Sequence, residues 1–346
     1  MSAVLTQIQQ TNMVSNSSDQ KADKTGPVTT ALCILFSIIF ITSLILNSMA
    51  AWIFFNINKN TTFIFYLKNT VIADLIMTMT FPLKIASAFS PEWLVIKQIE
   101  CRYSAVIFYI NMYVSILFLG LISIDRYMKI VKPFKTSRMN SFHFTRIVSA
   151  GVWMSMGLLS FPNMIFTNQS PKENFTECSQ LKSDFGKQWH GAVSYINILI
   201  FLLVFFVLVG CYLSICRYIR NTEKQFVSNR DMERKSNQNI CTVLLVFFIC
   251  FVPYHMCRIP FTLKQIQNDF DDNKNAILND AKKITLFISA CNVCLDPIIY
   301  LLMCKSFKTL LVQKLNLQHC SPFNRGTTRP SRPQVRRFRE YSPTGQ

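Results

Sequence analysis

The stretch YSAVIFYINMYVSILFLGLISIDRY, residues 103–127, decides the fold of this chain. It carries no charged residue from Tyr103 to Ile124 and then ends on an acid and a base, Asp125 and Arg126. A helix needs about 20 mostly apolar residues to cross the hydrocarbon layer of a bilayer. The stretch therefore predicts a membrane-spanning helix near residues 98–130 whose end is marked by two charges.

Six further apolar windows of similar length lie on both sides of this stretch. They run near 28–55, near 63–88, between Arg146 and Lys172, between Lys187 and Arg217, from Lys235 to about Leu263, and near 280–303. Only 16% of the 346 residues are charged, against about 25% in a typical soluble protein. We therefore predict an all-α membrane protein, a seven-transmembrane helix bundle.

The distribution of Lys and Arg predicts how the bundle is oriented. Basic residues crowd the segments after spans three, five and seven, and loops rich in Lys and Arg stay in the cytoplasm. The opposite segments hold candidate glycosylation sequences at Asn16, Asn168 and Asn174, which are modified only in the lumen. We expect a multi-pass plasma-membrane protein with an extracellular N-terminus and a cytoplasmic C-terminus. The same bias explains the net charge of +18, so we expect no nucleic-acid partner.

The ends of the chain differ from its middle in composition. We predict an extracellular segment over 1–27, the seven-transmembrane domain over 28–303, a short amphipathic helix on the membrane surface over 304–319, and a disordered cytoplasmic tail over 320–346. Cys320 follows the amphipathic segment and is a candidate for palmitoylation, although an unmodified cysteine is an equal alternative.

Two acids fall within the predicted spans, Asp74 in span two and Asp296 in span seven. Ionisable groups are costly inside a membrane, which makes each a candidate functional residue. Asn111, Ser115 and Asn292 are positioned to face them across the bundle. Such a cluster can hold a sodium ion or a shared proton, or it can serve only to lock helix packing. A structural sodium ion is the one cofactor that the sequence suggests.

Several short motifs together resemble the rhodopsin-like G-protein-coupled receptors over residues 28–315. The motifs are Asn47 in span one, Ala-Asp-Leu around Asp74, Asp125-Arg126-Tyr127 at the end of span three, Trp153 in span four, Phe251-Val-Pro253 in span six and Asp296-Pro-Ile-Ile-Tyr300 in span seven. The resemblance implies a disulfide between Cys101 and Cys178. It also implies coupling to a G protein through Asp125, Arg126, Tyr127 and Tyr300, and no enzyme activity.

Variants within these motifs narrow the resemblance. The Asp-Pro form in span seven and Phe251 in place of a tryptophan are similar to the purinergic nucleotide receptors. Longer strings, such as Cys291-Asn-Val-Cys-Leu-Asp-Pro, are similar to the subgroup that responds to ADP or UDP-sugars and to its orphan relative. This subgroup implies an inhibitory G protein, with arrestin and kinases as further candidate partners.

Basic residues near the predicted outer ends suggest a site for an anion. His255 and Arg258 are three apart and so share one helix face, and Arg258 lies inside an apolar run. Tyr109 and Tyr113 on span three can stack on a base or pack against an apolar tail. The subgroup resemblance implies a ligand set of Lys97, Tyr109, Asn163, Lys182, His255, Arg258, Gln265 and Lys282.

The identity of the anion stays open at this level. A nucleotide or nucleotide sugar suits converging cations under a low-dielectric roof, because charge-assisted hydrogen bonds strengthen there. A lysophospholipid such as lysophosphatidic acid would satisfy the same cations, and an orphan receptor is a further alternative. A rival class is an anion transporter or channel, but the chain shows no internal repeat of the kind that many transporters have.

Overall fold

The structure, a computed structural model, describes residues 27–57, 61–89, 93–132, 141–170, 178–223, 230–267 and 272–314, without the side chains of 222–240, 261 and 263–276. The helical elements in chain order are α2 (Pro27–Phe55), α3 (Thr62–Thr78), α4 (Phe81–Phe89), α5 (Leu94–Ile99), the π-helix η1 (Glu100–Ser104), α6 (Ala105–Val131), α7 (Phe142–Phe166), the 3-10 helix η3 (Cys178–Leu181), α8 (Asp184–Glu223), α9 (Arg230–Gln267), α10 (Asp272–Ala290), α11 (Asn292–Met303) and α12 (Lys305–Lys314).

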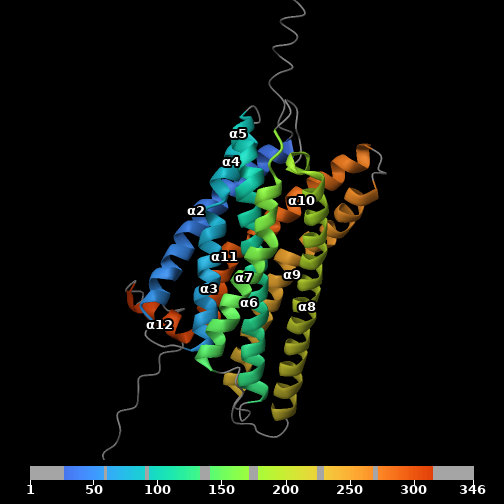
Figure 1. Ribbon diagram of the computed structural model, residues 1–346. Coiled ribbons are helices and arrows are strands. Elements are labelled where there is room, and N and C mark those ends of the chain that lie inside the picture. Colours follow the sequence, from blue (N-terminus) through green and yellow to red (C-terminus); the bar gives the residue numbers. More distant parts are fainter. Residues whose placement is uncertain are drawn as a thin grey trace, which may run out of the picture.

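Within these ranges no strand occurs, and seven helical segments are long and apolar enough to cross a membrane. The predicted fold class is therefore confirmed. Figure 1 shows the bundle from the side, with α5 at one end and α12 at the other. We call these the disulfide end, after Cys101, and the Arg126 end.

The outer surface of the bundle is apolar, as a lipid environment requires. On α8, Leu199, Leu203 and Phe206 recur three or four residues apart, and each is about two-thirds exposed, at 65%, 66% and 66%. A soluble helix would turn such a stripe toward its core and leave polar residues outside. Here the stripe faces outward, and the interior buries Asn47, Asp74 and other polar residues beside its apolar core, which identifies hydrocarbon as the surrounding solvent.

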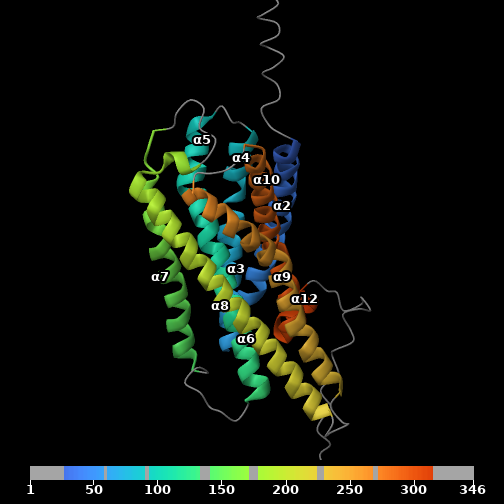
Figure 2. The same ribbon diagram turned by 90° about the vertical axis from the view of Figure 1, so that its right-hand side faces the viewer.

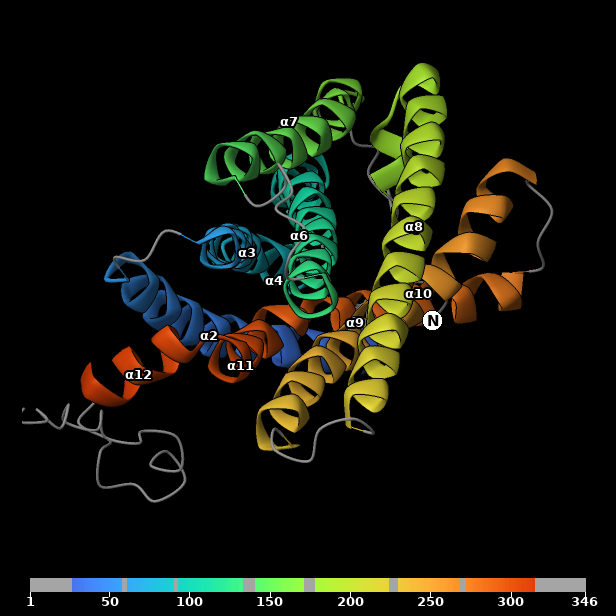
Figure 3. The ribbon, with the colours of Figure 1, turned by 90° about the horizontal axis from the view of Figure 1, so that it is seen from below.

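Helix α6 occupies the middle of the bundle, with α3, α7 and α8 around it (Figure 3). The side views show that α6, α8 and α9 extend farther than α2, α3 and α7 at the Arg126 end (Figures 1 and 2). Helix α12 lies across the foot of α2, where Phe307 is buried and its ring centroid is 4.9 Å from that of Phe54. The predicted short helix after span seven is thus confirmed.

One span is interrupted beside a proline, and a second carries a proline inside its helix, Pro297 in α11. The ring of Pro82 would clash with the carbonyl of Thr78, four residues earlier, and α3 ends at Thr78. Pro297 likewise has no N–H for the carbonyl of Val293. The side-chain amide of Asn47 on α2 donates to that carbonyl at 2.7 Å, so the missing helical hydrogen bond is replaced from another span.

Candidate functional site

A cavity of about 490 Å³ opens at the disulfide end between α4, α6, α7, α8, α9 and α10. Its roof includes the disulfide between Cys101 and Cys178, which confirms the predicted pair. Cys101 belongs to η1, at the start of span three, and Cys178 begins η3. The bond therefore ties the segment before α8 to the top of span three and holds its residues over the cavity.

Arg258 of α9 reaches the cavity from inside the bundle and is only 6% exposed. One guanidinium nitrogen donates to Ser194 Oγ at 2.7 Å and lies 3.2 Å from His190 Nε2, both on α8. Arginine can only donate, so His190 Nε2 accepts and its proton is on Nδ1. Neither partner is an acid. These two hydrogen bonds bridge spans five and six through uncharged acceptors.

Lys182 follows η3 and is held over the cavity, where it is 9% exposed. Burial, together with repulsion from Arg258 and Lys282, lowers the pKa of Lys182 to about 7. Both causes act against the charged form of the ammonium group. An anion placed among these three cations would remove the repulsion, so the site is electrostatically prepared for negative charge.

Charge of one sign dominates among the described residues that line the cavity. Five of them are basic and one is acidic, namely Lys84, Lys182, Arg258, Lys282, Lys283 and Glu100. Lys283 is the most outlying of the basic set, since its ammonium is 3.4 Å from Asp280 Oδ1 and its side chain is half exposed. Cavities lined by one sign of charge concentrate ligands of the opposite sign.

Tyr109, Tyr113 and Asn163 line the cavity as predicted, but His255 does not. His255 is 1% exposed and stacks on Phe201 with ring centroids 3.8 Å apart. Its Nδ1 donates to the Phe251 carbonyl at 2.8 Å, which leaves Nε2 to accept from the Tyr113 hydroxyl at 3.1 Å. His255 therefore lies beneath the cavity wall and contacts Tyr113, and its predicted contact with the ligand stays a prediction.

Two other predicted ligand residues, Lys97 and Gln265, are not among the described residues that line the cavity. Lys97 lies on α5, before η1, and is absent from the lining. The side chain of Gln265 lies outside the described residues. Of the modification sites, Asn168 is exposed just past α7, at the disulfide end. The described residues do not include Asn16, Asn174 or Cys320. They also leave out the predicted segment 320–346 and, except for Pro27, the predicted segment 1–27.

The lining also includes polar residues that the sequence analysis did not name, among them Lys84, His190, Ser194 and Asn197. The last three stand four and three residues apart on α8, a polar stripe at helical spacing that the sequence does contain. Lys84 is a charged residue within predicted span two, and a charge at such a position marks a candidate functional residue. Its ammonium lies 5.4 Å from the ring centroid of Phe36 and 5.3 Å from that of Phe108, so two aromatic faces hold it on the side of the cavity away from α8.

A second buried polar region lies deeper in the bundle, around Asp74 and Asp296. Both acids are fully buried, lie close enough to interact, and Asp74 accepts from the Tyr300 hydroxyl at 3.0 Å. One oxygen on each of five predicted residues is buried without a hydrogen-bond partner: Asp74 Oδ1, Asn111 Oδ1, Ser115 Oγ, Asn292 Oδ1 and Asp296 Oδ1. Such a set of oxygen donors suits a small hard cation. The residues therefore fit the sodium ion that the sequence suggested.

Comparison with known proteins decides the class of this molecule. Residues 46–300 match the family described as "7 transmembrane receptor (rhodopsin family)". The chain belongs to this family. The family is one of receptors and not of enzymes, which favours a receptor over the transporter or channel considered from sequence.

Relatives place the receptor more narrowly. It is 50% identical over 317 residues to G-protein coupled receptor 87 of Mus musculus, covering 91% of this chain and 88% of that receptor. It is 44% identical over 286 residues to purinoceptor 14 of Bos taurus, covering 82% and 85%, and 39% identical over 274 residues to purinoceptor 13 of Rattus norvegicus, covering 79% and 82%. The chain is thus a multi-pass plasma-membrane receptor of the purinoceptor-like group, with a ligand and a G protein as its partners.

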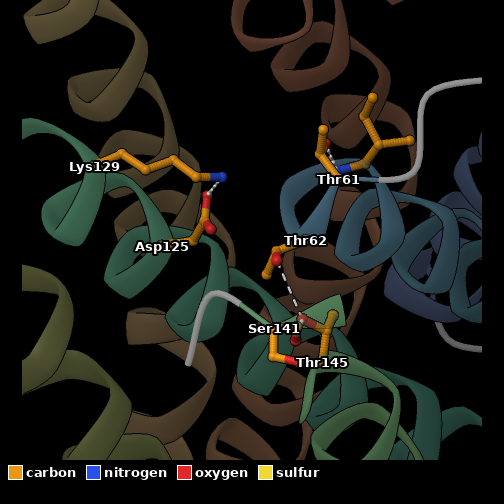
Figure 4. A network of polar contacts seen from close by, with 7 residues as sticks. Thr61, Thr62, Asp125, Lys129, Ser141 and Thr145 are labelled. Carbon is orange, nitrogen blue, oxygen red and sulfur yellow. Dashed lines mark hydrogen bonds and ion pairs between the residues drawn. The ribbon is translucent and has the colours of Figure 1, made fainter. Parts of the chain in front are cut away.

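At the receptor's Arg126 end, Asp125 is paired within its own helix. The Lys129 ammonium lies 2.8 Å from Asp125 Oδ2 (Figure 4). Arg126 instead places its guanidinium carbon 3.4 Å from the ring centroid of Phe63 on α3. Residues four apart face the same side of a helix, whereas neighbours point apart, which explains why Lys129 is the partner of Asp125.

Proposed function

We propose that this receptor senses an extracellular nucleotide or nucleotide sugar and signals through an inhibitory G protein, with its N-terminus outside the cell. The observation that carries the proposal is the cavity itself. It is lined by five basic residues against one acid, and its Arg258 is buried at the end of the apolar part of α9. The names of the relatives purinoceptor 14 and purinoceptor 13 point to the same ligand class.

A diphosphate satisfies the chemistry of the cavity better than a singly charged anion would. Arg258, Lys182 and Lys282 come from α9, from the segment after η3 and from α10, so they surround the space from three sides. A guanidinium binds phosphate oxygens in a bidentate manner, and lysines add point charges. The rings of Tyr109 and Tyr113 on α6 offer faces on which a base can stack.

Ligand binding would act through a shift between two states of the bundle. Arg258 lies on α9 and Lys282 on α10, so one anion held by both draws the disulfide ends of spans six and seven together. A ligand changes an equilibrium only through its different affinity for the two states. Pro253 lies within α9 below Arg258, where a proline weakens the helix and permits bending. An outward swing of the other end of α9 would expose Arg126 to the G protein.

The proposed orientation rests on where charged and polar features lie. Lys129, Lys132, Lys305 and Lys308 are at the Arg126 end, and this excess of basic residues favours the cytoplasmic side. Asn168 and the disulfide are at the opposite end. An oxidised cysteine pair is typical of the extracellular side.

A lysophospholipid is the alternative ligand, and one observation favours it. The lining includes Val106, Phe108, Val193 and Leu286 beside the cations, an apolar surface on which an acyl chain can pack. A phosphate monoester would use the same three cations. The ligand panel below therefore includes lysophosphatidic acid.

We also propose that sodium binds between Asp74 and Asp296. Asn111, Ser115 and Asn292 would complete its oxygen ligands, as their unpartnered oxygens indicate. The ion would supply the positive charge that two adjacent buried acids require. Arrestin and kinases remain expected partners of the cytoplasmic side.

The test is inhibition of stimulated cyclic AMP in expressing cells by ADP, UDP, UDP-glucose and lysophosphatidic acid. The decisive variant is Arg258→Ala, with Lys187→Gln as the matched control. Lys187 is an exposed cation at the same end, paired with Asp184 and outside the cavity lining. Surface amounts are measured for every variant.

A nucleotide response that Arg258→Ala abolishes and Lys187→Gln preserves would support the proposal. A nucleotide response unchanged in Arg258→Ala would exclude this cavity as the site. A response to lysophosphatidic acid alone would replace the nucleotide by the lipid alternative.

A further inference from the structure

The guanidinium of Arg126 packs against Phe63 of α3. The guanidinium carbon is 3.4 Å from the centroid of the Phe63 ring, the closest cation–ring approach among the described residues. Phe63 is 4% exposed, so the contact is largely removed from water. A cation over an aromatic face is attracted most strongly when both are desolvated.

The neighbouring acid does not restrain Arg126 through an ion pair. The Lys129 ammonium takes Asp125 Oδ2 at 2.8 Å, while Asp125 Oδ1 is buried without a hydrogen-bond partner. Among the described residues, the Nε of Arg126 is buried without a hydrogen-bond partner. The charge of Asp125 acts on the half-buried guanidinium without an ion pair, so the Phe63 ring is the described group that contacts its face directly.

Phe63 is held in place by the start of α3. The Thr61 side chain caps this helix by accepting from the Ile64 N–H at 3.3 Å. The hydroxyl of Thr62, next to Phe63, is hydrogen-bonded to the Thr145 hydroxyl of α7 at 3.2 Å, and Figure 4 shows both contacts beside Asp125. Span two is thus hydrogen-bonded to span four at the residue before Phe63. This bond fixes the position of the Phe63 ring against which the Arg126 guanidinium packs.

We infer that Phe63 is a positioning residue that holds Arg126 in the resting receptor and limits coupling to the G protein in the absence of ligand. Loss of the ring would release the guanidinium from α3 toward the space that a G protein enters. The inference concerns the coupling end alone and does not depend on which ligand fills the cavity.

The test measures agonist-free nucleotide exchange. Membranes with equal surface amounts of receptor are mixed with purified inhibitory, stimulatory and Gq-class heterotrimers, and binding of a non-hydrolysable GTP analogue is followed. Phe63→Leu and Phe63→Met remove the ring but keep apolar volume, and Phe63→Tyr keeps the ring. Phe65→Leu is the matched control, because Phe65 lies on the same helix but packs against Phe142 of α7, with ring centroids 5.4 Å apart.

We expect Phe63→Leu and Phe63→Met to raise basal exchange roughly three- to tenfold, the factor that a desolvated cation–ring contact represents. Phe63→Tyr and Phe65→Leu should stay near the wild-type rate. A purely structural role would not be rescued by the tyrosine. Unchanged or lowered exchange in both ring-free variants, or an equal rise in Phe63→Tyr, would overturn the inference. Should Phe63→Leu fail to reach the surface, Phe63→Met alone decides.

Discussion

The cavity at the disulfide end and the acid cluster in the middle of the bundle are opposites in charge and in solvation. The cavity gathers five cations against one acid and is open to ligand. The cluster gathers Asp74 and Asp296, both with no exposed surface. Each region has charge of one sign in a low-dielectric setting, which is costly without a counter-charge. The cavity therefore suits a removable anion, whereas the cluster suits a small cation that stays.

The two regions share helix α6. Tyr113 lines the cavity and donates to His255 beneath it, and Asn111 and Ser115 on the same helix, α6, belong to the acid cluster. A change at the cavity can thus reach the cluster through one helix. Experiments that alter one region and leave the other intact sharpen the comparison.

The largest of these effects, a loss of nucleotide potency, is expected at Lys282. The adjacent Lys283 has different surroundings and serves as its comparison. Lys282→Gln should reduce the potency of the active nucleotide about ten- to hundredfold, the loss that one charge-assisted hydrogen bond represents. Lys283→Gln should change potency less than about threefold, because its half-exposed ammonium already lies 3.4 Å from Asp280. Concentration–response curves for cyclic AMP inhibition measure both. Equal losses of potency in the two variants would show that ligand binding depends only on the total positive charge of the cavity and not on the position of Lys282.

Acidity should modulate binding to the cavity through Lys182. The pKa of this lysine is lowered to about 7 in the free receptor, and a bound anion favours the charged form and raises the pKa again. Binding therefore takes up a proton, and affinity should fall up to about tenfold per unit as pH rises above 7. A phosphate is already ionised there, since its second pKa is about 6.

Radioligand affinity across pH 6.5 to 8.5 measures this effect, and the interval brackets the pKa of about 7. In Lys182→Met the slope should vanish while some affinity persists through Arg258 and Lys282. A slope that survives in Lys182→Met would assign the titration to another group.

A smaller effect, on the stability of the receptor, is expected from loss of the hydrogen bond between Asn47 and the Val293 carbonyl. Asn47→Ala should lower the free energy of unfolding by about 1–3 kcal/mol, because the Val293 carbonyl loses its 2.7 Å donor inside the bundle. Thermal denaturation of the detergent-solubilised receptor measures the shift. Asn56→Ala is the control, since Asn56 donates to the Trp52 carbonyl at an exposed position. Equal Tm values for the two variants would contradict the role given to Asn47.

The smallest effect is expected from sodium itself. Sodium should raise the Tm of the receptor by a few degrees over potassium at equal ionic strength, because a ligand of the folded state stabilises it. Asp74→Asn should remove the difference between the two ions, while its cavity keeps all its cations. A sodium effect that persists in Asp74→Asn would place the ion elsewhere.

Most of the cavity's cations could be named from the sequence, whereas the depth of His255 could not. Arg258, Lys182 and Lys282 were predicted from the rarity of charge near membrane spans and from resemblance, and all three line the cavity. His255 was assigned to the ligand because it shares a helix face with Arg258. Helical spacing gives the direction of a side chain but not its depth relative to neighbouring helices, and Phe201 and Tyr113 cover that ring.

The sequence by itself determined the seven spans, the helix after them and the family, because lipid demands long apolar helices and the motifs are specific as a set. Only the tertiary structure decided which polar groups meet. It joined Asn47 to the Val293 carbonyl, Arg258 to His190 and Ser194, and Arg126 to the Phe63 ring. Those pairings depend on how helices cross and where prolines interrupt them, and no local pattern along one chain segment contains that information.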